Sequence, residues 1–280
     1  MVFLAPAKIN LSLRILGKRA DGFHEIETVM APLSLADTLD IELGEGSGVE
    51  FTCSDTSLPL DGTNLVCRAV DAFSRHTGRQ FHARIHLEKK IPHGAGLGGG
   101  SSDAASTLKA LNTILGSGLS VDDLESLAGT LGSDVPFFIR SCPATCRGRG
   151  ELVEPLASFP EANVLLVKPP FPIPTPWAYQ AYQKSNKSAE TFRQFHGSIE
   201  LMNDLEAPVF SKYLVLPVLK RWLLVQAGVI SAMMSGSGST IFAIVNKDAV
   251  DLDARLLSEF GAPFLLHRCQ LMGSSPVGLH

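Results

Sequence analysis

The sequence predicts an α+β protein with two domains. Strand-type and helix-type segments follow one another in an order that does not repeat, which is typical of mixed folds. The length of 280 residues exceeds the ~100–200 residues of an average domain. Residues 154–160 carry little patterning of either kind. We therefore expect an N-terminal domain over residues 1–155 and a C-terminal domain over residues 156–280.

The periodicity of apolar residues places the elements of the N-terminal domain. Residues 8–15 alternate strictly between apolar and polar side chains, which predicts a strand with one buried face. A turn is expected at residues 19–22. Further elements are expected in this order: strands over 24–29, 37–43 and 49–53, a helix over 64–75 and a strand over 81–89.

A glycine-rich loop follows over residues 92–100, and a helix begins after it. Apolar residues at helical spacing predict that this helix ends near Leu115, and Ser101, Ser102 and Asp103 are its expected caps. The remaining elements are expected in this order: a helix over 121–130, a strand over 163–168, a proline-rich loop over 169–176 and several helices, strands over 230–234 and 240–245, a helix over 249–259 and a strand over 263–271.

Composition and charge exclude several classes of protein. Apolar residues make up 45% of the chain and charged residues 19%, which suits a packed core. The net charge of −4 argues against a protein that binds nucleic acid by its phosphates. The first residues lack a basic start and an apolar run of signal-peptide length, and no stretch approaches ~20 apolar residues. We therefore expect a cytoplasmic protein without a membrane segment.

Histidines and cysteines give little indication of a structural metal. The 5 cysteines are an odd number and are scattered, which suits reduced thiols. Cys142 and Cys146 form the one close pair, and their spacing without a second pair is unlike a zinc site. His82 and His86 lie in an expected strand, about 13 Å apart, too far to share one ion.

The strongest functional signal is the glycine-rich loop. Glycine permits positive φ and close backbone approach, so successive N–H groups can converge on one anion. The following helix adds unpaired N–H groups and the positive end of its dipole. The loop therefore predicts a phosphate site, with a flexible surface loop as the alternative. The expected phosphate-binding residues are Pro92, Gly94, Ala95, Gly96, Leu97, Gly98, Gly99, Gly100, Ser101 and Ser102.

Other well-known motifs do not account for this loop. A Walker A motif needs a lysine after the glycines, and none follows here. Gly94, Gly96 and Gly99 match the dinucleotide pattern GxGxxG, but the acidic residue expected about 20 residues later, at the end of a second strand, is missing. A serine hydrolase is disfavoured because no GxSxG surrounds Ser101 or Ser237.

Five further segments carry a family resemblance together with this loop. They are Pro6–Leu11 (PAKINL), Arg19–His24 (RADGFH), Gly132–Phe138 (GSDVPFF), Asn203–Glu206 (NDLE) and Met234–Gly238 (MSGSG). In this order the segments resemble the GHMP kinases and, within them, the 4-diphosphocytidyl-2-C-methyl-D-erythritol kinases. The resemblance implies an N-terminal domain like domain 2 of ribosomal protein S5, a ferredoxin-like C-terminal domain and an active site in the cleft between them.

The implied reaction transfers the γ-phosphate of ATP, with Mg²⁺, to the 2-hydroxyl of 4-diphosphocytidyl-2-C-methyl-D-erythritol, a step of the non-mevalonate isoprenoid pathway. By resemblance, Asp134 is the general base, and Lys8 keeps it ionised and stabilises developing charge. Without the resemblance, Asp134 is more often a turn or cap residue, and Lys8 a solvated strand residue. Asn10 is expected near the acceptor end of the substrate.

Aromatic residues are expected to hold the cytidine end. By resemblance, Phe23 and Tyr179 stack on the two faces of cytosine and His24 hydrogen-bonds its edge. The family usually has tyrosine where this chain has Phe23, so a hydroxyl contact is lost. Core packing is the alternative for both rings. Arg147 and Arg149 are either solvated or reach the diphosphate.

At the nucleotide end, Asn64 and Lys89 match positions that line the adenine pocket in relatives. Asn64 also suits a helix N-cap. Ser101 or Ser102 is the expected protein ligand of Mg²⁺, because no acidic cluster indicates another. The loop over residues 235–239 is expected to close over the substrate, or else to be a tight hairpin.

Two other functions stay open on the sequence. A GHMP kinase acting on a smaller alcohol, of the mevalonate or homoserine type, needs no aromatic clamp such as Phe23, His24 and Tyr179. A nucleotide-dependent oxidoreductase, or a non-catalytic nucleotide-binding module, needs neither Lys8 nor Asp134.

Overall fold

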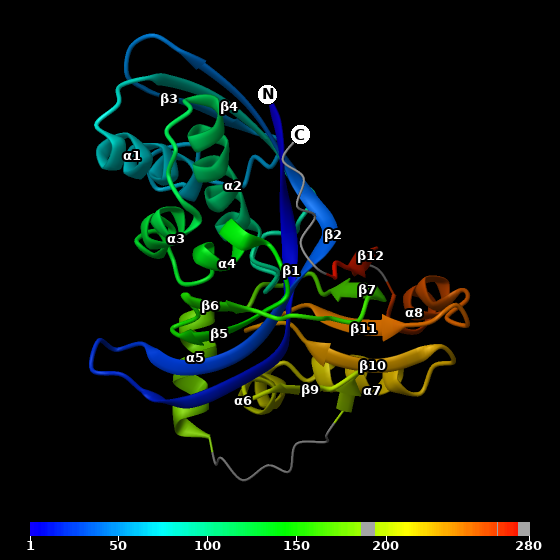
Figure 1. Cartoon of the computed structure of the whole chain (residues 1–280). Coiled ribbons are helices and arrows are strands. Elements are labelled where there is room, and N and C mark those ends of the chain that lie inside the picture. The colour runs from blue at the N-terminus through cyan, green and yellow to red at the C-terminus, as the bar shows by residue number, and fades with distance from the viewer. Residues whose placement is uncertain (186–193, 262, 274–280) are drawn as a thin grey trace.

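Two long antiparallel strands, β1 (Val2–Lys18) and β2 (His24–Gly44), run through the whole molecule (Figure 1). The computed structural model describes residues 1–185, 194–261 and 263–273. Within these residues, every other strand joins β1 and β2 directly or through a neighbour, in one 12-stranded sheet. The two halves of the chain are therefore built on the same pair of strands.

The first half of the chain covers one end of this pair with helices. Beside β2, the sheet is extended by β4 and β3 on one stretch and by the β5–β6 hairpin on another. The elements are β3 (Gly48–Cys53), α1 (Leu65–Thr77), β4 (His82–Glu88), α2 (Gly99–Ile114), α3 (Val121–Gly129), α4 (Val135–Arg140), β5 (Ala144–Gly148) and β6 (Leu152–Pro155).

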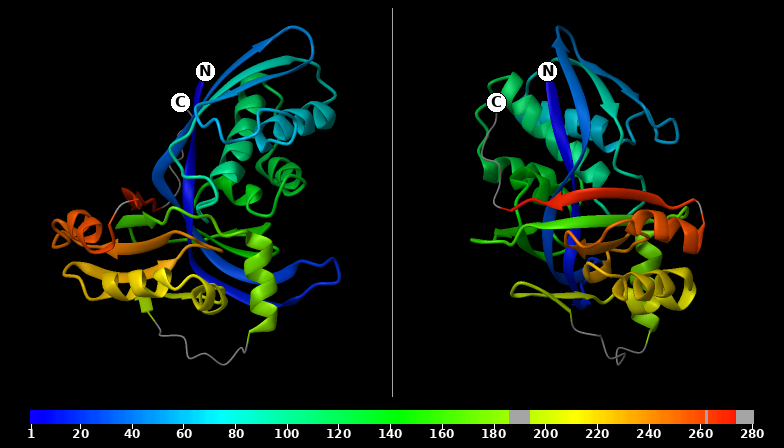
Figure 2. Two further views of the ribbon diagram at one scale, coloured as in Figure 1. Left: turned by 180° about the vertical axis from the view of Figure 1, so that it is seen from behind. Right: turned by 90° about the vertical axis from the view of Figure 1, so that its right-hand side faces the viewer.

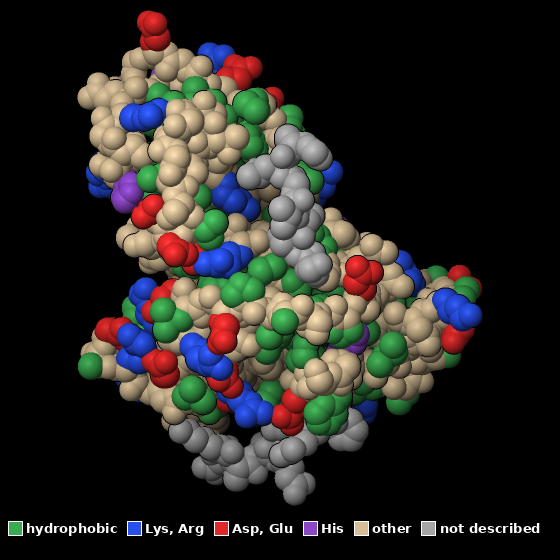
Figure 3. All heavy atoms as spheres, viewed as in Figure 1, with side chains coloured by type: hydrophobic (Ala, Val, Ile, Leu, Met, Phe, Trp, Pro, Cys, Tyr) green, Lys and Arg blue, Asp and Glu red, His purple; other side chains and the backbone are tan. Residues whose placement is uncertain are grey.

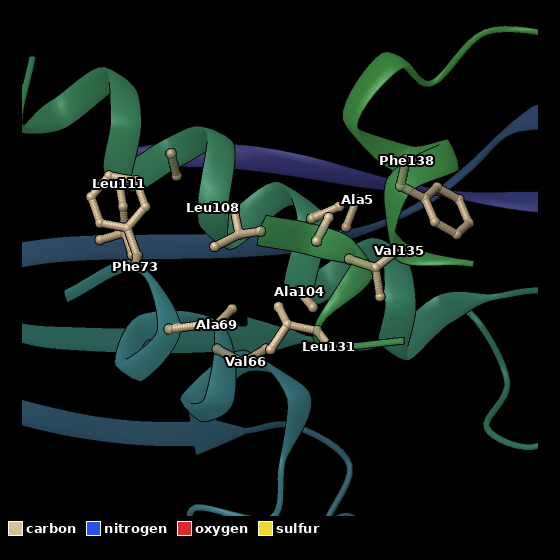
Figure 4. Close-up of a cluster of buried hydrophobic side chains, with 14 of the residues drawn as sticks. Ala5, Val66, Ala69, Phe73, Ala104, Leu108, Leu111, Leu131, Val135 and Phe138 are labelled. Atoms are coloured by element: carbon tan, nitrogen blue, oxygen red, sulfur yellow. The ribbon is translucent and has the colours of Figure 1, made fainter. Parts of the chain in front are cut away.

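Small residues on α2 allow close packing in this half. Ala104 and Ala105 are fully buried, and Leu108 and Leu111 extend the same buried face towards Phe73 of α1 (Figure 4). Fully burying a leucine or phenylalanine side chain contributes about 1.5–3 kcal/mol, so this cluster fixes α2 firmly against the sheet. Because α2 directly follows the glycine-rich loop, that packing also fixes one end of the loop.

The second half wraps the other end of β1 and β2. The sheet order is β10-β11-β7-β12-β2-β1-β9-β8, so β12 attaches this half to β2 and β9 attaches it to β1 (Figures 1 and 2). Its elements are β7 (Ala162–Lys168), α5 (Thr175–Lys184), β8 (Gln194–His196), β9 (Ile199–Asn203), α6 (Glu206–Lys212), α7 (Val215–Leu224), β10 (Val229–Met234), β11 (Ile241–Val245), α8 (Leu252–Phe260) and β12 (Leu265–Leu271).

The first strand contributes to all three hydrophobic clusters of the core. Ala5 packs in the first half, Ile9 in a cluster between the halves, and Leu13 in the second half. The central cluster also contains Ala95 and Leu97 of the glycine-rich loop. The loop is thus anchored where the two halves meet.

Several expectations from the sequence are wrong. The strands expected over 24–29 and 37–43 are one strand, because Pro32 stays in β2 and its carbonyl oxygen accepts a hydrogen bond from the Met272 N–H (2.9 Å). Part of the region expected to be helical forms the β8–β9 hairpin, and α4, β5 and β6 give no clear sequence signal. The domain limit at 155/156 stays a prediction. Across the described residues, no helix is long and apolar enough to cross a membrane.

Candidate active site

A single cavity of about 810 Å³ brings together nearly all the residues that the sequence predicts for the site. The lining includes Lys8 and Asn10 from β1 and Asp134 from the start of α4. Of the candidates, Ser102 and Arg147 are absent from the lining. The other candidates in the lining are Phe23, His24, Asn64, Lys89, Pro92, Gly94, Ala95, Gly96, Leu97, Gly98, Gly99, Gly100, Ser101 and Tyr179.

The glycine-rich loop alternates left-handed glycines with buried apolar residues. Gly94, Gly96 and Gly98 have φ of 62°, 76° and 72°, a region that residues with a Cβ rarely adopt. Between them, Ala95 and Leu97 are 2% and 1% exposed. The apolar side chains hold the loop against the core, while the glycines turn its backbone. Such a backbone can direct successive N–H groups at an anion.

Backbone contacts from both halves fix the loop. The Lys8 N–H donates to the Leu97 carbonyl oxygen (2.9 Å), and the Ser235 hydroxyl donates to the Gly96 carbonyl oxygen (2.9 Å). A Cβ at Gly96 would lie 2.2 Å from the Ser235 carbonyl oxygen, so only glycine fits there. The loop over 235–239, which joins β10 to β11, therefore packs directly on the glycine-rich loop. Its residues Gly236, Ser237 and Gly238 also line the cavity.

The helix after the loop begins without a capping side chain. The sequence predicts Ser101, Ser102 and Asp103 as caps, but α2 starts at Gly99, with Gly98 as N-cap and no side-chain hydrogen bond. The capping prediction is wrong because these three residues lie inside the helix, as its third to fifth residues. Helices leave their first N–H groups without intrahelical partners, and no side chain among the described residues is hydrogen-bonded to those of α2. This end of α2 is therefore suited to a phosphate.

A buried ionic cluster joins the two ends of the glycine-rich loop. The Lys89 ammonium group pairs with Asp37 and with Asp103 (2.8 Å to Asp103 Oδ2). Asp37 Oδ1 also accepts from the Lys90 and Ile91 N–H groups. Burial opposes the charge of Lys89, but Asp103 and Asp37 outweigh it and raise its pKa. Burial raises the pKa of Asp103 to about 7, against the lowering effect of Lys89.

Lys89 therefore lines the cavity with its ammonium group already paired to two carboxylates. Asn64 has a similar double position: it lines the cavity and is also the N-cap of α1, accepting from the Val66 N–H (2.9 Å). The structure thus keeps both interpretations of Asn64.

Lys8 and Asp134 form an ion pair on the wall of the cavity. Lys8 Nζ lies 3.3 Å from Asp134 Oδ2 and donates to Asn10 Oδ1 (2.7 Å). Asn10 Nδ2 in turn donates to Thr28 Oγ1 (2.8 Å), which fixes the amide. The Lys8 side chain is 4% exposed and that of Asp134 36%. The carboxylate is thus held by a buried cation and open to the cavity on another side.

The capping alternative for Asp134 does not explain its side chain. Asp134 precedes α4 as its N-cap residue, yet its side chain makes no capping hydrogen bond. Its carboxylate instead meets Lys8, which comes from β1, at the other end of the sequence. Alternation in β1 buries the apolar side chains on one face and presents Lys8 and Asn10 on the other. The strand pattern therefore aims both polar groups at the cavity.

Aromatic residues gather at another part of the cavity. The rings of His24 and Tyr179 are stacked, with centroids 5.0 Å apart and planes inclined by 25°. The Arg149 guanidinium lies 4.9 Å from the centroid of Phe23, a ring that is 50% exposed. Burial, and secondarily Asp134, raises the pKa of the Tyr179 hydroxyl. The sequence predicts Phe23 and Tyr179 as partners across a base, whereas Tyr179 here packs on His24.

The two arginines flanking Gly148 differ in their surroundings. Arg147 pairs with Glu27 (3.0 Å) and Glu154 (2.7 Å) on the outside of the β5 strand, in agreement with a solvated role. Arg149 lines the cavity and pairs with Glu151 (3.6 Å from Nε to Oε1). Acidic and basic side chains are intermingled over the face seen in Figure 3, so the described surface there carries no extended patch of one sign.

The sequence gives no role to two further residues, one in the cavity lining and one behind it. Gln183 lines the cavity and its Nε2 lies 2.6 Å from His24 Nε2. Its spacing of four residues from Tyr179 on α5 is the available sequence signal, since such residues share a helix face. Asn203 is buried and donates to the carbonyl oxygens of Met234 and Gly236 (2.8 Å each), which fixes the 235–239 loop.

Comparisons with known proteins identify the family. The family models described as GHMP kinases N terminal domain and GHMP kinases C terminal match residues 64–141 and 186–262. A 4-diphosphocytidyl-2-C-methyl-D-erythritol kinase of Methylacidiphilum infernorum (isolate V4) is 47% identical over 247 residues, 87% of this chain and 86% of that protein. The chain belongs to the GHMP kinases.

A further relative has the same name, and solved structures share the fold of this GHMP kinase. A kinase of the same name from Protochlamydia amoebophila (strain UWE25) is 40% identical over 86% of this chain and 83% of its own. A crystal structure of 4-(cytidine 5'-diphospho)-2C-methyl-D-erythritol kinase matches with a TM-score of 0.78 and 35% identity, covering 97% of this chain and 99% of its own. Homoserine kinase from Cytophaga hutchinsonii ATCC 33406 shares the fold, with a TM-score of 0.69 at 20% identity and coverage of 98% and 95%.

This GHMP kinase is therefore an ATP-dependent enzyme with the two-domain fold of its family. In the part of the chain that the structure describes, no group of three or more His, Cys, Asp or Glu side chains is placed to hold a metal ion. Ser101 lines the cavity, whereas Ser102 is fully buried and its Oγ has no hydrogen-bond partner among the described residues. Ser101 thus fits a role at a phosphate-bound cation better than Ser102.

Proposed function

We propose that this kinase phosphorylates the 2-hydroxyl of 4-diphosphocytidyl-2-C-methyl-D-erythritol, in the non-mevalonate route to isoprenoids. One observation carries the proposal: the Lys8–Asp134 pair lies in the same cavity as the glycine-rich loop and the aromatic residues. The cavity is large enough, at about 810 Å³, for the reacting ends of a nucleotide and an extended substrate. The names of the relatives support the same acceptor.

In the proposed reaction, Asp134 accepts the proton of the substrate hydroxyl. The hydroxyl oxygen then forms a bond to the γ-phosphorus, the bond from that phosphorus to the β,γ-bridging oxygen breaks, and ADP leaves with the electron pair. Lys8, held by Asn10, keeps the carboxylate oriented and stabilises negative charge on the transferred group. Asn10 is thereby expected beside the acceptor hydroxyl.

The glycine-rich loop is the proposed site of the ATP phosphates. Its positive-φ glycines and the uncapped first turn of α2 supply N–H donors. Asn64 and Lys89 line the same cavity. Mg²⁺ keeps most of its ligands as water and phosphate oxygen, so the single hydroxyl of Ser101 suffices as a protein ligand. When bound, Mg²⁺ neutralises phosphate charge.

The cytidine end is proposed to bind among Phe23, His24 and Tyr179. These three residues line the cavity, and none of them is required by a small acceptor such as mevalonate or homoserine. Arg149, over the Phe23 ring, is placed to meet an anionic group beside the base. Core packing does not explain Phe23, because that side chain is half exposed.

An assay coupled to ADP release tests the proposal. We expect release with the cytidyl substrate and little with mevalonate or homoserine at the same concentration. Asp134→Asn and Lys8→Met are each expected to lower kcat by roughly 10²–10⁴-fold, because each removes part of the proton-transfer and charge-stabilising pair.

Lys168→Met is the matched control. Lys168 is also buried, at 8% exposure, but it lies outside the cavity and donates to the Pro169 carbonyl oxygen. It is expected to change stability and to leave kcat near the wild-type value. ADP release only with a small alcohol would refute the proposed acceptor. Near-normal turnover by folded Asp134→Asn would refute the proposal that Asp134 is the general base.

A further inference from the structure

His24 is held on two sides by one face of α5. Tyr179 stacks on its ring at 5.0 Å, and Gln183, four residues further along the helix, lies 2.6 Å from its Nε2. Residues four apart on a helix lie one above the other, so α5 supplies both contacts from adjacent turns. The ring therefore has a fixed plane and a fixed hydrogen-bond partner before any ligand enters.

The contact with Gln183 determines which nitrogen of the imidazole carries the proton. The atom of Gln183 nearest the ring is Nε2, and a carboxamide nitrogen only donates hydrogen bonds. His24 Nε2 must then accept, and in the neutral ring the proton lies on Nδ1. Burial, followed by the nearby charge of Lys18, lowers the pKa of His24, which favours the neutral ring.

The Nδ1–H is the group that remains for a ligand. Within residues 1–185, 194–261 and 263–273, His24 Nδ1 has no hydrogen-bond partner, and His24 lines the cavity. A donor at this place pairs with an acceptor on the edge of a base. The ring nitrogen N3 of cytosine is such an acceptor, whereas N3 of uracil carries a hydrogen.

We propose that Gln183 is a positioning residue that fixes the His24 proton on Nδ1 and so makes the base site select cytosine over uracil. The inference rests on the proposed function, since it concerns the base of the cytidyl substrate. It adds a residue that does not touch the reacting atoms and acts through the histidine. Because a polar group is left unpaired against the wrong base, the expected preference is roughly 10- to 100-fold, which corresponds to about 1.4–2.7 kcal/mol.

The test compares cytidyl and uridyl forms of the same substrate at pH 8 with the full chain. Wild-type enzyme is expected to favour the cytidyl form by at least tenfold in kcat/KM. Gln183→Ala should reduce this preference towards unity. Gln183→Glu should reduce it further, because a carboxylate accepts from Nε2–H and leaves Nδ1 as an acceptor, which suits the N3–H of uracil.

A second measurement reads the tautomer directly. Nitrogen-15 NMR of histidine-labelled enzyme, with the His24 signals assigned by their loss in His24→Ala, should show the proton on Nδ1 in the wild type and on Nε2 in Gln183→Glu. Lys184→Ala is the control: Lys184 is the exposed neighbour on α5 and does not line the cavity. It should match the wild type in both measurements.

Two results would overturn the inference: a proton on Nε2 of wild-type His24, or an unchanged preference between the two substrates in folded Gln183→Glu. Failure of the proposed function looks different. In that case the wild-type enzyme would phosphorylate neither the cytidyl nor the uridyl substrate. That result would also overturn the selection of cytosine. The nitrogen spectra would still decide whether Gln183 sets the tautomer of His24.

Discussion

Replacing Gly96 by alanine should destabilise the protein at the contact between its two halves. Gly96 has φ of 76°, and a Cβ there would lie 2.2 Å from the Ser235 carbonyl oxygen and 3.1 Å from that of Gly238. Both neighbours are backbone atoms, so no side-chain rotation relieves the overlap. The loop over 235–239 must instead move away from the glycine-rich loop.

The expected loss follows from two terms. A residue with a Cβ in the left-handed region costs about 1–2 kcal/mol, and forcing extra volume into packed structure costs about 1–3 kcal/mol. Their sum is about 2–5 kcal/mol, which lowers the melting temperature by roughly 4–20 °C for a chain of this size. Activity should fall as well, because the 235–239 loop lines the cavity.

Gly100→Ala is the matched control. Gly100 lies in α2 with ordinary helical backbone, and the nearest atom to an added Cβ is Leu65 Cδ1 at 3.7 Å. Alanine in place of glycine inside a helix stabilises it by about 0.5–1 kcal/mol. Thermal unfolding followed by circular dichroism compares the two variants. Equal melting temperatures for Gly96→Ala and wild type, or an equal loss in Gly100→Ala, would refute the steric argument.

Two further predictions concern buried polar groups. Asn203→Leu removes the donors to the carbonyl oxygens of Met234 and Gly236. It should destabilise the protein by about 2–6 kcal/mol in thermal unfolding, since each of these two unpaired buried groups costs about 1–3 kcal/mol. A change below about 1 kcal/mol would contradict this. The second follows from the folded-state pKa of Asp103, which is about 7 and raised by burial. Between about pH 4 and 7 the folded protein binds more protons at Asp103 than the unfolded chain does. The contribution of Asp103 to the free energy of unfolding therefore falls as pH rises, by at most about 1.4 kcal/mol per pH unit. The melting temperature of Asp103→Asn relative to wild type should therefore rise from pH 5 to pH 7, and parallel curves would contradict the argument.

Local patterns predict the parts of the site that depend on one segment. The alternation of residues 8–15 puts Lys8 and Asn10 on one face, and the glycine spacing predicts a turning backbone before α2. Both follow from stereochemistry within a few residues. The Asp134 pairing with Lys8 does not follow in that way. It depends on α2, which packs against both β1 and α4 and so brings Asp134 to Lys8. Only the family resemblance indicates this pairing from the sequence.

Long-range pairing accounts for the wrong predictions. The sequence predicts separate strands over 24–29 and 37–43, yet β2 continues through Pro32. Lys8 of β1 pairs with Pro32, and the Met272 N–H donates to its carbonyl oxygen. The hairpin of β8 and β9 is short and is stabilised by β1, next to Ser12 and Leu13. Likewise, Asp103 resembles a helix cap, but it lies inside α2 and pairs with the buried ammonium group of Lys89. In each case the deciding partner is distant in sequence.

The place of β12 between β7 and β2 has a consequence for synthesis of the protein. β2 is made early, but the backbone pairing of Leu271 with Leu33 becomes available only after almost the whole described chain has left the ribosome. Until then, the edge of β2 near Leu33 remains unpaired, as does part of the central core that Leu271 fills. Unpaired strand edges promote association between chains. We therefore expect folding of the newly synthesised kinase to depend on chaperones or on fast completion of the chain.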